Sequence, residues 1–182
     1  KLQVELHEFS LWEFFSELRS FYDDGVAKEV QLVWSYPSDL PSVRCDRAKL
    51  RRILENLIDN AIKFTERGTI GIVGRYLPRE KMLQIKVLDT GEGIPQEQIP
   101  KIFERFQQVP GGGATLHGGF GLGLYLVKKY VEVLGGQIQV NSRLGESSSF
   151  TLQIPAPVDN TTTAPQQLRP ATASEPFGAD AH

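Results

Sequence analysis

The sequence predicts a two-layer α+β sandwich, in which a mixed and mostly antiparallel sheet carries about three helices on one face. Two observations favour this class. Segments in which apolar and polar residues alternate outnumber the helical segments, and the two kinds do not follow each other one for one. A doubly wound parallel sheet would require that regular succession. The apolar fraction of 40% and the charged fraction of 23% are typical of a globular domain.

The first half of the chain supplies two of the predicted helices. Ser10 is a suitable N-cap for an amphipathic helix over 11–22, and Asp46 for a longer helix that ends near Thr65. Gly68 lies just past that end, where glycine is common. Strands are expected where apolar and polar residues alternate. In this half they cover 2–6, 30–34, 70–76 and 83–88, and the last two form a hairpin-like pair.

The second half supplies two further helical segments and the closing strands. Residues 96–106 are predicted to form a short helical segment. Residues 121–134 are predicted to form a helix that the Gly135-Gly136 pair ends. The closing strands are expected at 137–141 and 149–154.

Composition also divides the chain. Residues 155–182 are rich in Ala, Pro and Thr, and they carry too few large apolar residues to offset the entropy of ordering them. We therefore expect one domain over 1–154, followed by a disordered tail or linker over 155–182. The net charge of −2 gives no general attraction to nucleic acid or to an anionic membrane surface. No apolar run approaches the ~20 residues of a membrane-spanning helix.

Cysteine usage bears on the compartment. The chain has one cysteine, Cys45, which cannot form an internal disulfide. That usage fits a reducing environment and predicts a cytoplasmic location, although the parent protein could still be anchored to a membrane.

The predicted helix that follows Asp46 has two faces. One is an apolar stripe at helical spacing that we expect to face the core: Leu50, Ile53, Leu54, Leu57, Ile58 and Ala61. The other carries Asn56, Asn60 and Lys63 at i, i+4 and i+7. A solvated face would explain these polar residues, but asparagine is unfavourable in the middle of a helix. Carboxamide oxygens suit Mg²⁺, and a lysine beside them can pair with phosphate.

A second polar motif, Asp89-Thr90-Gly91-Glu92-Gly93-Ile94, directly follows a predicted strand. An aspartate at a strand end can accept a hydrogen bond from an exocyclic amine. Gly91 and Gly93 would allow the backbone to approach a flat ring, against which Ile94 offers an apolar surface. The alternative is an ordinary turn in which Asp89 caps its own loop.

A third motif is the glycine-rich stretch from Pro110 to Gly123, which immediately precedes an apolar helix. Backbone amides free of a Cβ, together with the N-terminus of a helix, form a suitable site for phosphate. A hinge or a tight turn would explain an isolated pair of glycines equally well. Phe103 and Phe106 are expected to anchor the base of this stretch in the core.

In this order, these segments resemble the ATP-binding catalytic domain of sensor histidine kinases. That family belongs to the superfamily of type II topoisomerases, ninety-kilodalton chaperones and mismatch-repair ATPases. The resemblance spans roughly residues 9–155 and implies a Bergerat-type ATP-binding fold with ATP and Mg²⁺ as ligands. It also implies partners: an upstream dimerisation domain that carries the acceptor histidine, and the receiver domain of a response regulator.

The resemblance assigns roles to individual residues. Asn60 would bind Mg²⁺ with the help of Asn56, Lys63 would bind phosphate, and Phe64 would lie beside the base. Asp89 would recognise the adenine amino group. The other residues of the expected binding site are Gly91, Gly93 and Ile94 along the base, and Gly119, Gly121, Leu122, Gly123 and Leu124 along the triphosphate.

The sequence also departs from the family pattern. Gln107-Gln108 replaces an aromatic residue and a phosphate-binding arginine, for which Arg105 is the nearest substitute. Asn56 stands where ATP-hydrolysing members of the superfamily have a basic glutamate. No catalytic base is therefore assigned, and transfer of the γ-phosphate to an external histidine is favoured over hydrolysis. The alternative function is a catalytically inactive nucleotide-binding sensor or scaffold of the same fold.

Overall fold

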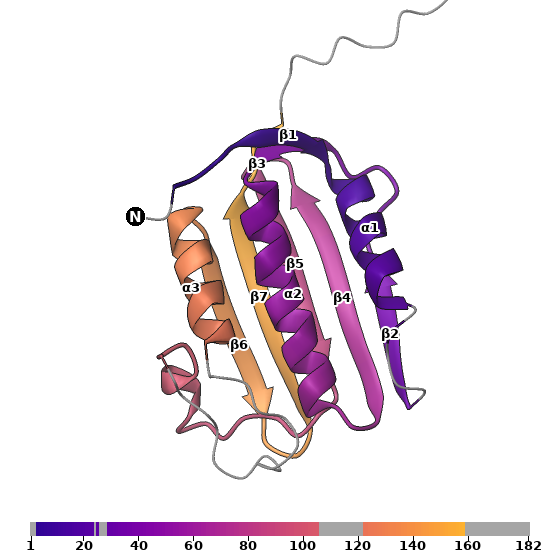
Figure 1. Cartoon of the computed structure of the whole chain (residues 1–182), viewed down its shortest axis with the longest axis vertical. Coiled ribbons are helices and arrows are strands. Elements are labelled where there is room, and N and C mark those ends of the chain that lie inside the picture. Colours follow the sequence, from indigo (N-terminus) through magenta and orange to yellow (C-terminus); the bar gives the residue numbers. More distant parts are fainter. Residues whose placement is uncertain (1–2, 24, 26–28, 106–121, 159–182) are drawn as a thin grey trace, which may run out of the picture.

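The computed structural model describes residues 3–23, 25, 29–105 and 122–158 of the 182-residue chain (Figure 1). Its elements follow a simple order along the chain. They are β1 (His7–Ser10), α1 (Leu11–Asp23), β2 (Val30–Ser35), β3 (Ser42–Cys45), α2 (Arg47–Phe64), β4 (Gly68–Leu77), β5 (Met82–Asp89), a 3₁₀ turn (Ile99–Lys101), α3 (Gly123–Val133), β6 (Gln137–Arg143) and β7 (Ser147–Pro155).

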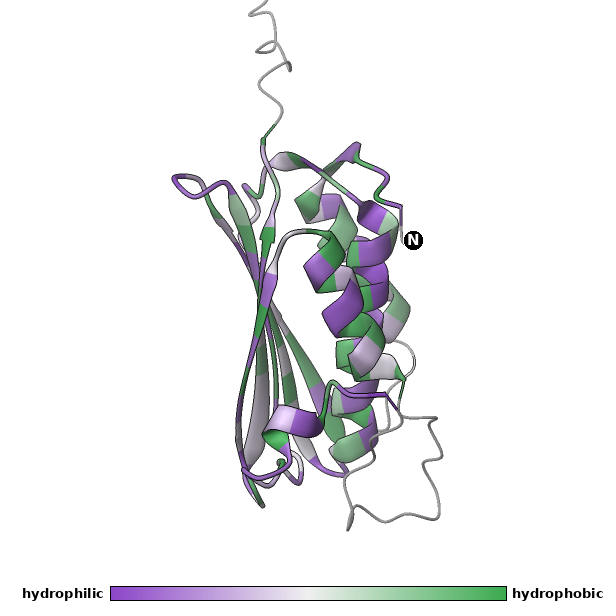
Figure 2. Cartoon of the chain, turned by 90° about the vertical axis from the view of Figure 1, so that its left-hand side faces the viewer, coloured by the Kyte–Doolittle hydropathy of each residue, from purple (hydrophilic) through white to green (hydrophobic). Residues whose placement is uncertain are grey.

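Five strands form one twisted sheet in the order β2-β4-β5-β7-β6. All neighbours are antiparallel except β2 and β4, which run parallel, so the sheet is mixed, as predicted. The three helices lie side by side on one face, with α2 between α1 and α3 (Figures 1 and 2). In the described part of the chain, no helix covers the opposite face. The predicted two-layer α+β fold is confirmed.

Helix α2 is the central helix of the layer that covers the sheet. Asp46 caps it by accepting a hydrogen bond from the backbone N–H of Lys49 at 3.0 Å. All six residues of the predicted apolar stripe are buried: Leu50, Ile53, Leu54, Leu57, Ile58 and Ala61. Burying one such large aliphatic side chain contributes about 1.5–3 kcal/mol. The stripe therefore fixes the rotation of α2 about its axis, which determines where its polar face points.

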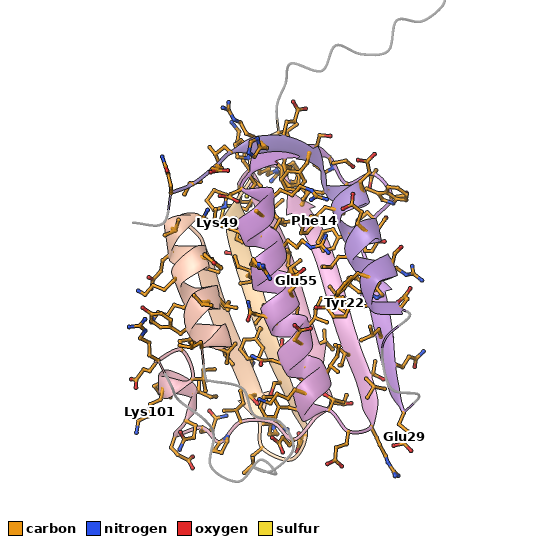
Figure 3. The ribbon with its side chains drawn as sticks, viewed as in Figure 1. Phe14, Tyr22, Glu29, Lys49, Glu55 and Lys101 are labelled. Atoms are coloured by element: carbon orange, nitrogen blue, oxygen red, sulfur yellow. The ribbon has the colours of Figure 1, made fainter. Side chains whose placement is uncertain are left out.

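Helix α1 is tied to both the sheet and α2. The Phe15 ring lies against Gly74 of β4, where a Cβ would come within 2.6 Å of the ring. On the other side, the Tyr22 hydroxyl donates to Asp59 Oδ1 of α2 at 2.7 Å. Burial, reinforced by this hydrogen bond, raises the pKa of Tyr22 far above its usual value. Figure 3 shows Tyr22 on the side of α1 that faces α2.

Two predicted elements differ from the structure. The strand expected at 2–6 is wrong, because residues 3–6 form no strand and β1 begins only at His7. The N–H of Glu5 donates to Asp46 Oδ2 at 2.9 Å instead of joining a ladder. β1 pairs with β3, a short strand that the sequence analysis did not predict. Its alternation covers only four residues, of which Val43 and Cys45 are buried.

The helical segment expected at 96–106 is reduced to the single 3₁₀ turn Ile99–Lys101 in the described part of that range. Proline at 95 and 100 supplies no backbone N–H, so a longer hydrogen-bonded helix is disfavoured here. Phe106 lies outside the described residues, whereas Phe103 packs against the core, edge-on to Phe150. No helix in the described residues is both long and apolar enough to cross a membrane.

Candidate functional site

The polar face of α2 points toward the start of α3. The Nδ2 group of Asn56 donates to the backbone oxygen of Arg52 at 2.7 Å, which turns Oδ1 of the same carboxamide outward. A Cβ on Gly123, the first residue of α3, would lie 2.9 Å from that oxygen. Glycine at this position therefore lets the N-terminus of α3 approach the carboxamide. The first N–H groups of a helix lack partners within it, so anion-binding groups meet Asn56 here.

The next two turns of α2 continue this face. Asn60 and Lys63 are half-buried, and the Lys63 ammonium lies 5.1 Å from the centre of the Phe64 ring. That ring is 39% exposed, although it is aromatic. The structure thus places the predicted metal, phosphate and base residues along one line, from the middle of α2 to its C-terminal end.

Asp89 ends β5 as a buried carboxylate that is only 6% exposed. It accepts hydrogen bonds from the backbone N–H groups of Gly91, at 2.9 Å, and Ser148. Burial raises the pKa of Asp89, helped by the charge of Glu92, while the two backbone hydrogen bonds act in the opposite direction. No cation among the described residues is bonded to Asp89. A buried carboxylate of this kind, with acceptor capacity left, is suited to receive N–H donors from a ligand.

Gly91 joins Asp89 to the end of α2. A Cβ at Gly91 would collide with the Phe64 backbone oxygen, and it would lie 2.8 Å from Thr65 Oγ1 and 2.9 Å from Asp89 Oδ1. The neighbouring N–H of Glu92 donates to the same Phe64 oxygen at 3.2 Å. Only a residue without a side chain permits this approach, which brings Phe64, Asp89 and Gly91 together.

The loop after Asp89 is held on its far side by the turn between β6 and β7. Gly93 has φ = +69°, and a Cβ there would collide with the Arg143 backbone oxygen. The N–H of Ile94 donates to Ser142 Oγ at 2.8 Å, and the Gln96 side chain donates to Ser142 O at 2.6 Å. The loop is therefore fixed at both ends, and Ile94 packs against the core.

Ser142 and Ser148 support the candidate site, and the sequence analysis missed both. Both are buried, and their hydroxyl oxygens lie 2.8 Å apart. Ser142 Oγ donates to the Ser147 backbone oxygen, so the Ser148 hydroxyl is the donor between the two serines. The only signal in the sequence was the run of three serines at 147–149, which does not reveal a partner in β6.

The glycine-rich stretch is only partly visible. Gly119 and Gly121 lie outside the described residues, as do Gln107, Gln108 and Phe120. Leu122 immediately precedes α3, and both Leu122 and Leu124 are half-buried. Arg105, the substitute suggested for the missing arginine, lies over the Tyr125 ring of α3 at 5.0 Å.

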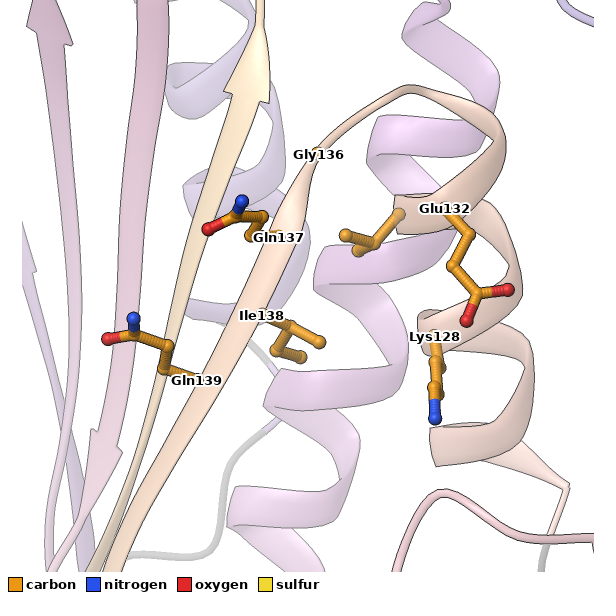
Figure 4. Close-up of a pocket in the computed structure, with 7 residues that line it drawn as sticks. Lys128, Glu132, Gly136, Gln137, Ile138 and Gln139 are labelled. Atoms are coloured by element: carbon orange, nitrogen blue, oxygen red, sulfur yellow. The ribbon is translucent and has the colours of Figure 1, made fainter.

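A separate groove of about 390 Å³ runs between α3 and the edge strand β6 (Figure 4). It is lined by Lys128, Val131, Glu132, Gly136, Gln137, Ile138 and Gln139. None of the predicted site residues lines it, so the groove is not part of the candidate site.

Comparison with known proteins decides the family. A model of the histidine kinase-, DNA gyrase B- and HSP90-like ATPases matches residues 45–158, which include every predicted site residue. The chain belongs to this family. The resemblance to the ATP-binding catalytic domains of sensor histidine kinases is confirmed, and with it a role in ATP binding within two-component signalling.

Individual relatives agree with this assignment. The chain is 35% identical to the autoinducer 2 sensor kinase/phosphatase LuxQ of Vibrio cholerae serotype O1, over 97% of this chain and 21% of the relative. It is 38% identical to the adaptive-response sensory kinase SasA of Crocosphaera subtropica, over 85% of this chain and 40% of the relative. The chain therefore spans less than half the length of either curated relative.

Solved structures share the fold. The catalytic domain of the histidine kinase ThkA matches with a TM-score of 0.69 and 28% identity, over 83% of this chain and 95% of that domain. Full-length ShkA in complex with AMPPNP matches with a TM-score of 0.75 and 26% identity, over 87% of this chain and 32% of ShkA.

Proposed function

We propose that this domain binds Mg-ATP and donates the γ-phosphate to a histidine on a separate upstream dimerisation domain. The observation that carries the proposal is Asp89, a buried carboxylate that two backbone amides orient and that no cation of the described residues neutralises. Such a carboxylate can accept a hydrogen bond from the exocyclic amino group of the adenine base. The family match supports the same ligand.

The residues present fit the rest of the nucleotide. Gly91, Gly93 and Ile94 would lie along the base, beside the exposed ring of Phe64. The outward oxygen of Asn56 and the Asn60 carboxamide would hold Mg²⁺, whose preferred ligands are oxygens, and Lys63 would bind phosphate. Gly119, Gly121, Leu122, Gly123 and Leu124 would border the triphosphate. ATP supplies the phosphoryl group, whose bond to the ADP oxygen breaks as an imidazole nitrogen of the acceptor takes it.

The acid–base groups on α2 favour transfer over hydrolysis. Asn56 carries a carboxamide, which is not basic near neutral pH, and its nitrogen is already bonded to Arg52. The two neighbouring carboxylates are also held: Glu55 bonds to Arg51 at 2.8 Å, and Asp59 accepts the Tyr22 hydroxyl. Neither carboxylate is poised to activate a water molecule, which favours transfer to an external histidine over hydrolysis.

This proposal includes partners and boundaries. The acceptor would be a dimerisation domain, and a response-regulator receiver domain would take the phosphoryl group next. We assign the kinase domain to 1–154 and a tail or linker to 155–182, although Ala156 is buried and Pro157 O still accepts from Arg44 N. We place the domain in the cytoplasm because ATP is supplied there.

Nucleotide binding is the first test. Calorimetric titration with AMPPNP and Mg²⁺ should give saturable binding, which Asp89→Asn weakens about tenfold or more, since a hydrogen bond to a charged group contributes about 1.5–3 kcal/mol. The matched control is Asp39→Asn, which makes the same change at an exposed site and should bind like the wild type. Equal affinity of the Asp89→Asn variant and the wild type would remove Asp89 from the site.

Phosphotransfer is the second arm of the same experiment. Incubation with γ-labelled ATP should label a supplied acceptor domain and leave this chain unlabelled, because none of its three histidines lies in a helical acceptor motif of the sequence. Replacing the acceptor histidine should abolish the label. Stable, acid-labile label on this chain alone would contradict the division of roles. An unlabelled acceptor, with nucleotide bound, would support the sensor or scaffold alternative.

A further inference from the structure

Thr65, the residue that ends α2, has a buried hydroxyl without a hydrogen-bond partner. The residue is 2% exposed, and Oγ1 is one of two such orphaned side-chain atoms in the described residues, the other being Trp34 Nε1 on β2. Buried hydroxyls are nearly always paired, because desolvating one without a partner is unfavourable. An orphan of this kind at the edge of a ligand site therefore calls for a functional explanation.

The hydroxyl lies beside the carboxylate that has acceptor capacity left. Thr65 Oγ1 and Asp89 Oδ1 lie 2.8 and 2.9 Å from one point, the position that a Cβ on Gly91 would occupy. Among the described residues, Oγ1 is thus a donor without an acceptor. The Asp89 carboxylate accepts only from the backbone amides of Gly91, at Oδ1, and Ser148. The two oxygens are close but not hydrogen-bonded to each other, and no side chain at Gly91 separates them.

We propose that Thr65 is a positioning residue for Asp89, to whose carboxylate its hydroxyl donates a hydrogen bond when the nucleotide base is bound. This inference rests on the proposed ATP binding. A base amine that donates to Asp89 favours the ionised carboxylate, and an ionised carboxylate in turn attracts a further donor. The two hydrogen bonds therefore strengthen each other, and the hydroxyl gains its missing partner only in the complex.

The decisive variant is Thr65→Val, which replaces the hydroxyl with a methyl group of similar size. The backbone of Thr65 is extended, with φ = −118° and ψ = 101°, and this conformation suits valine. Without nucleotide, the variant should melt higher by about 2–4 °C, because an unpaired buried hydroxyl is removed. Its affinity for AMPPNP with Mg²⁺ should fall about tenfold, because the complex loses a hydrogen bond to a charged group. A rise in melting temperature together with a fall in nucleotide affinity would identify Thr65 as a positioning residue for Asp89.

A double-mutant cycle with Asp89→Asn tests whether Thr65 acts through Asp89. If it does, Thr65→Val should change affinity far less in the Asp89→Asn background than in the wild type. Thr65→Ser should restore affinity, and Thr151→Val, the same change at a half-buried position on β7, should leave affinity unaltered. Thr65→Ala serves as a second variant if the valine variant does not fold.

The outcomes separate this inference from the function on which it rests. A wild type that does not bind nucleotide overturns the proposed function. A wild type that binds, together with a Thr65→Val variant of equal affinity, overturns the role of Thr65 alone. Equal losses in the wild-type and Asp89→Asn backgrounds would show that Thr65 supports the site without acting on Asp89, and would also overturn it.

Discussion

Two buried aspartates, Asp46 before the start of α2 and Asp89 beside its end, differ in how their charges are compensated. Asp46 is 2% exposed and Asp89 is 6% exposed, so both residues are shielded from solvent. Asp46 accepts hydrogen bonds from Glu5 N, Lys49 N and the Lys49 ammonium, at 2.9, 3.0 and 2.8 Å. Within the part of the chain that the structure describes, Asp89 accepts hydrogen bonds only from the backbone amides of Gly91 and Ser148. Figure 3 shows Lys49 near the N-terminal end of α2.

The pKa values of the two carboxyls show the consequence. Burial alone would raise the pKa of Asp46, but the bonds from Glu5 and Lys49 outweigh it and leave the pKa below its ordinary value. Burial dominates at Asp89 and raises its pKa. Asp46 therefore stabilises the fold, whereas Asp89 retains a destabilising charge that a ligand donor can compensate. One helix thus has a structural end at Asp46 and, in the function that we propose, a binding end at Asp89.

The largest expected effect comes from breaking the structural end. Asp46→Ala removes the helix cap and leaves the Glu5 and Lys49 groups without their acceptor, which should lower the free energy of unfolding by about 2–3 kcal/mol. Urea unfolding measures this loss. Nucleotide affinity of the folded fraction should not change, because Asp46 lies at the far end of α2 from Asp89. Asp39→Ala, at an exposed aspartate, is the control and should be nearly neutral.

A smaller loss of stability, by about 1–3 kcal/mol, is expected from Gly91→Ala at the binding end. The new Cβ would force the loop away from the Phe64 backbone oxygen and disturb Thr65 and Asp89. Unlike Asp46→Ala, this variant should also lose most of its nucleotide affinity, as measured by titration with AMPPNP. Gly25→Ala adds a Cβ that meets nothing within 4 Å, so it should preserve both properties. Wild-type affinity in Gly91→Ala would show that the close approach is not needed.

The two ends of α2 also differ in how far the sequence predicted them. The Asp46 cap and the apolar stripe from Leu50 to Ala61 are local patterns within one helix, so periodicity alone was sufficient. The face with Asn56, Asn60 and Lys63 follows from that same periodicity. The position of Asp89 after an alternating strand left an ordinary turn as the alternative, and the resemblance to the family implied its role at the base.

What the sequence did not predict depends on contacts between distant segments. Ser142 supports the loop at Ile94 from 48 residues away, and Asp46 binds Glu5 from 41 residues away. The second contact explains why the strand expected at 2–6 does not form. The role of Thr65 requires the approach of Gly91, which no local pattern encodes. Local sequence propensity predicts helices and strands, whereas tertiary packing determines which loops contact each other.

The smallest expected effect is a pair of opposite slopes in stability against pH. The folded state holds the Asp89 proton more tightly than the unfolded state, so stability should fall as pH rises from the ordinary aspartate pKa through the raised one. Asp46 releases its proton more easily when folded, so its stabilisation should be lost as pH falls from the ordinary pKa through the lowered one. We call the loss of stability above the ordinary aspartate pKa the upper slope, and the loss below it the lower slope. Asp89→Asn should remove only the upper slope, and Asp46→Asn only the lower slope. Each corresponds to a shift in melting temperature of about 2 °C or less.

Thermal melts of the wild type, Asp89→Asn and Asp46→Asn at closely spaced pH values measure both slopes. Glu92 contributes to the raised pKa of Asp89, so Glu92→Gln should reduce the upper slope without removing it. Saturating Mg-AMPPNP should also flatten the upper slope, because a donor on the ionised carboxylate lowers its pKa, and should leave the lower slope intact. A nucleotide effect on the lower slope would show that the two ends of α2 are coupled, contrary to the separation between Asp46 and Asp89. An upper slope that survives in Asp89→Asn would belong to another group.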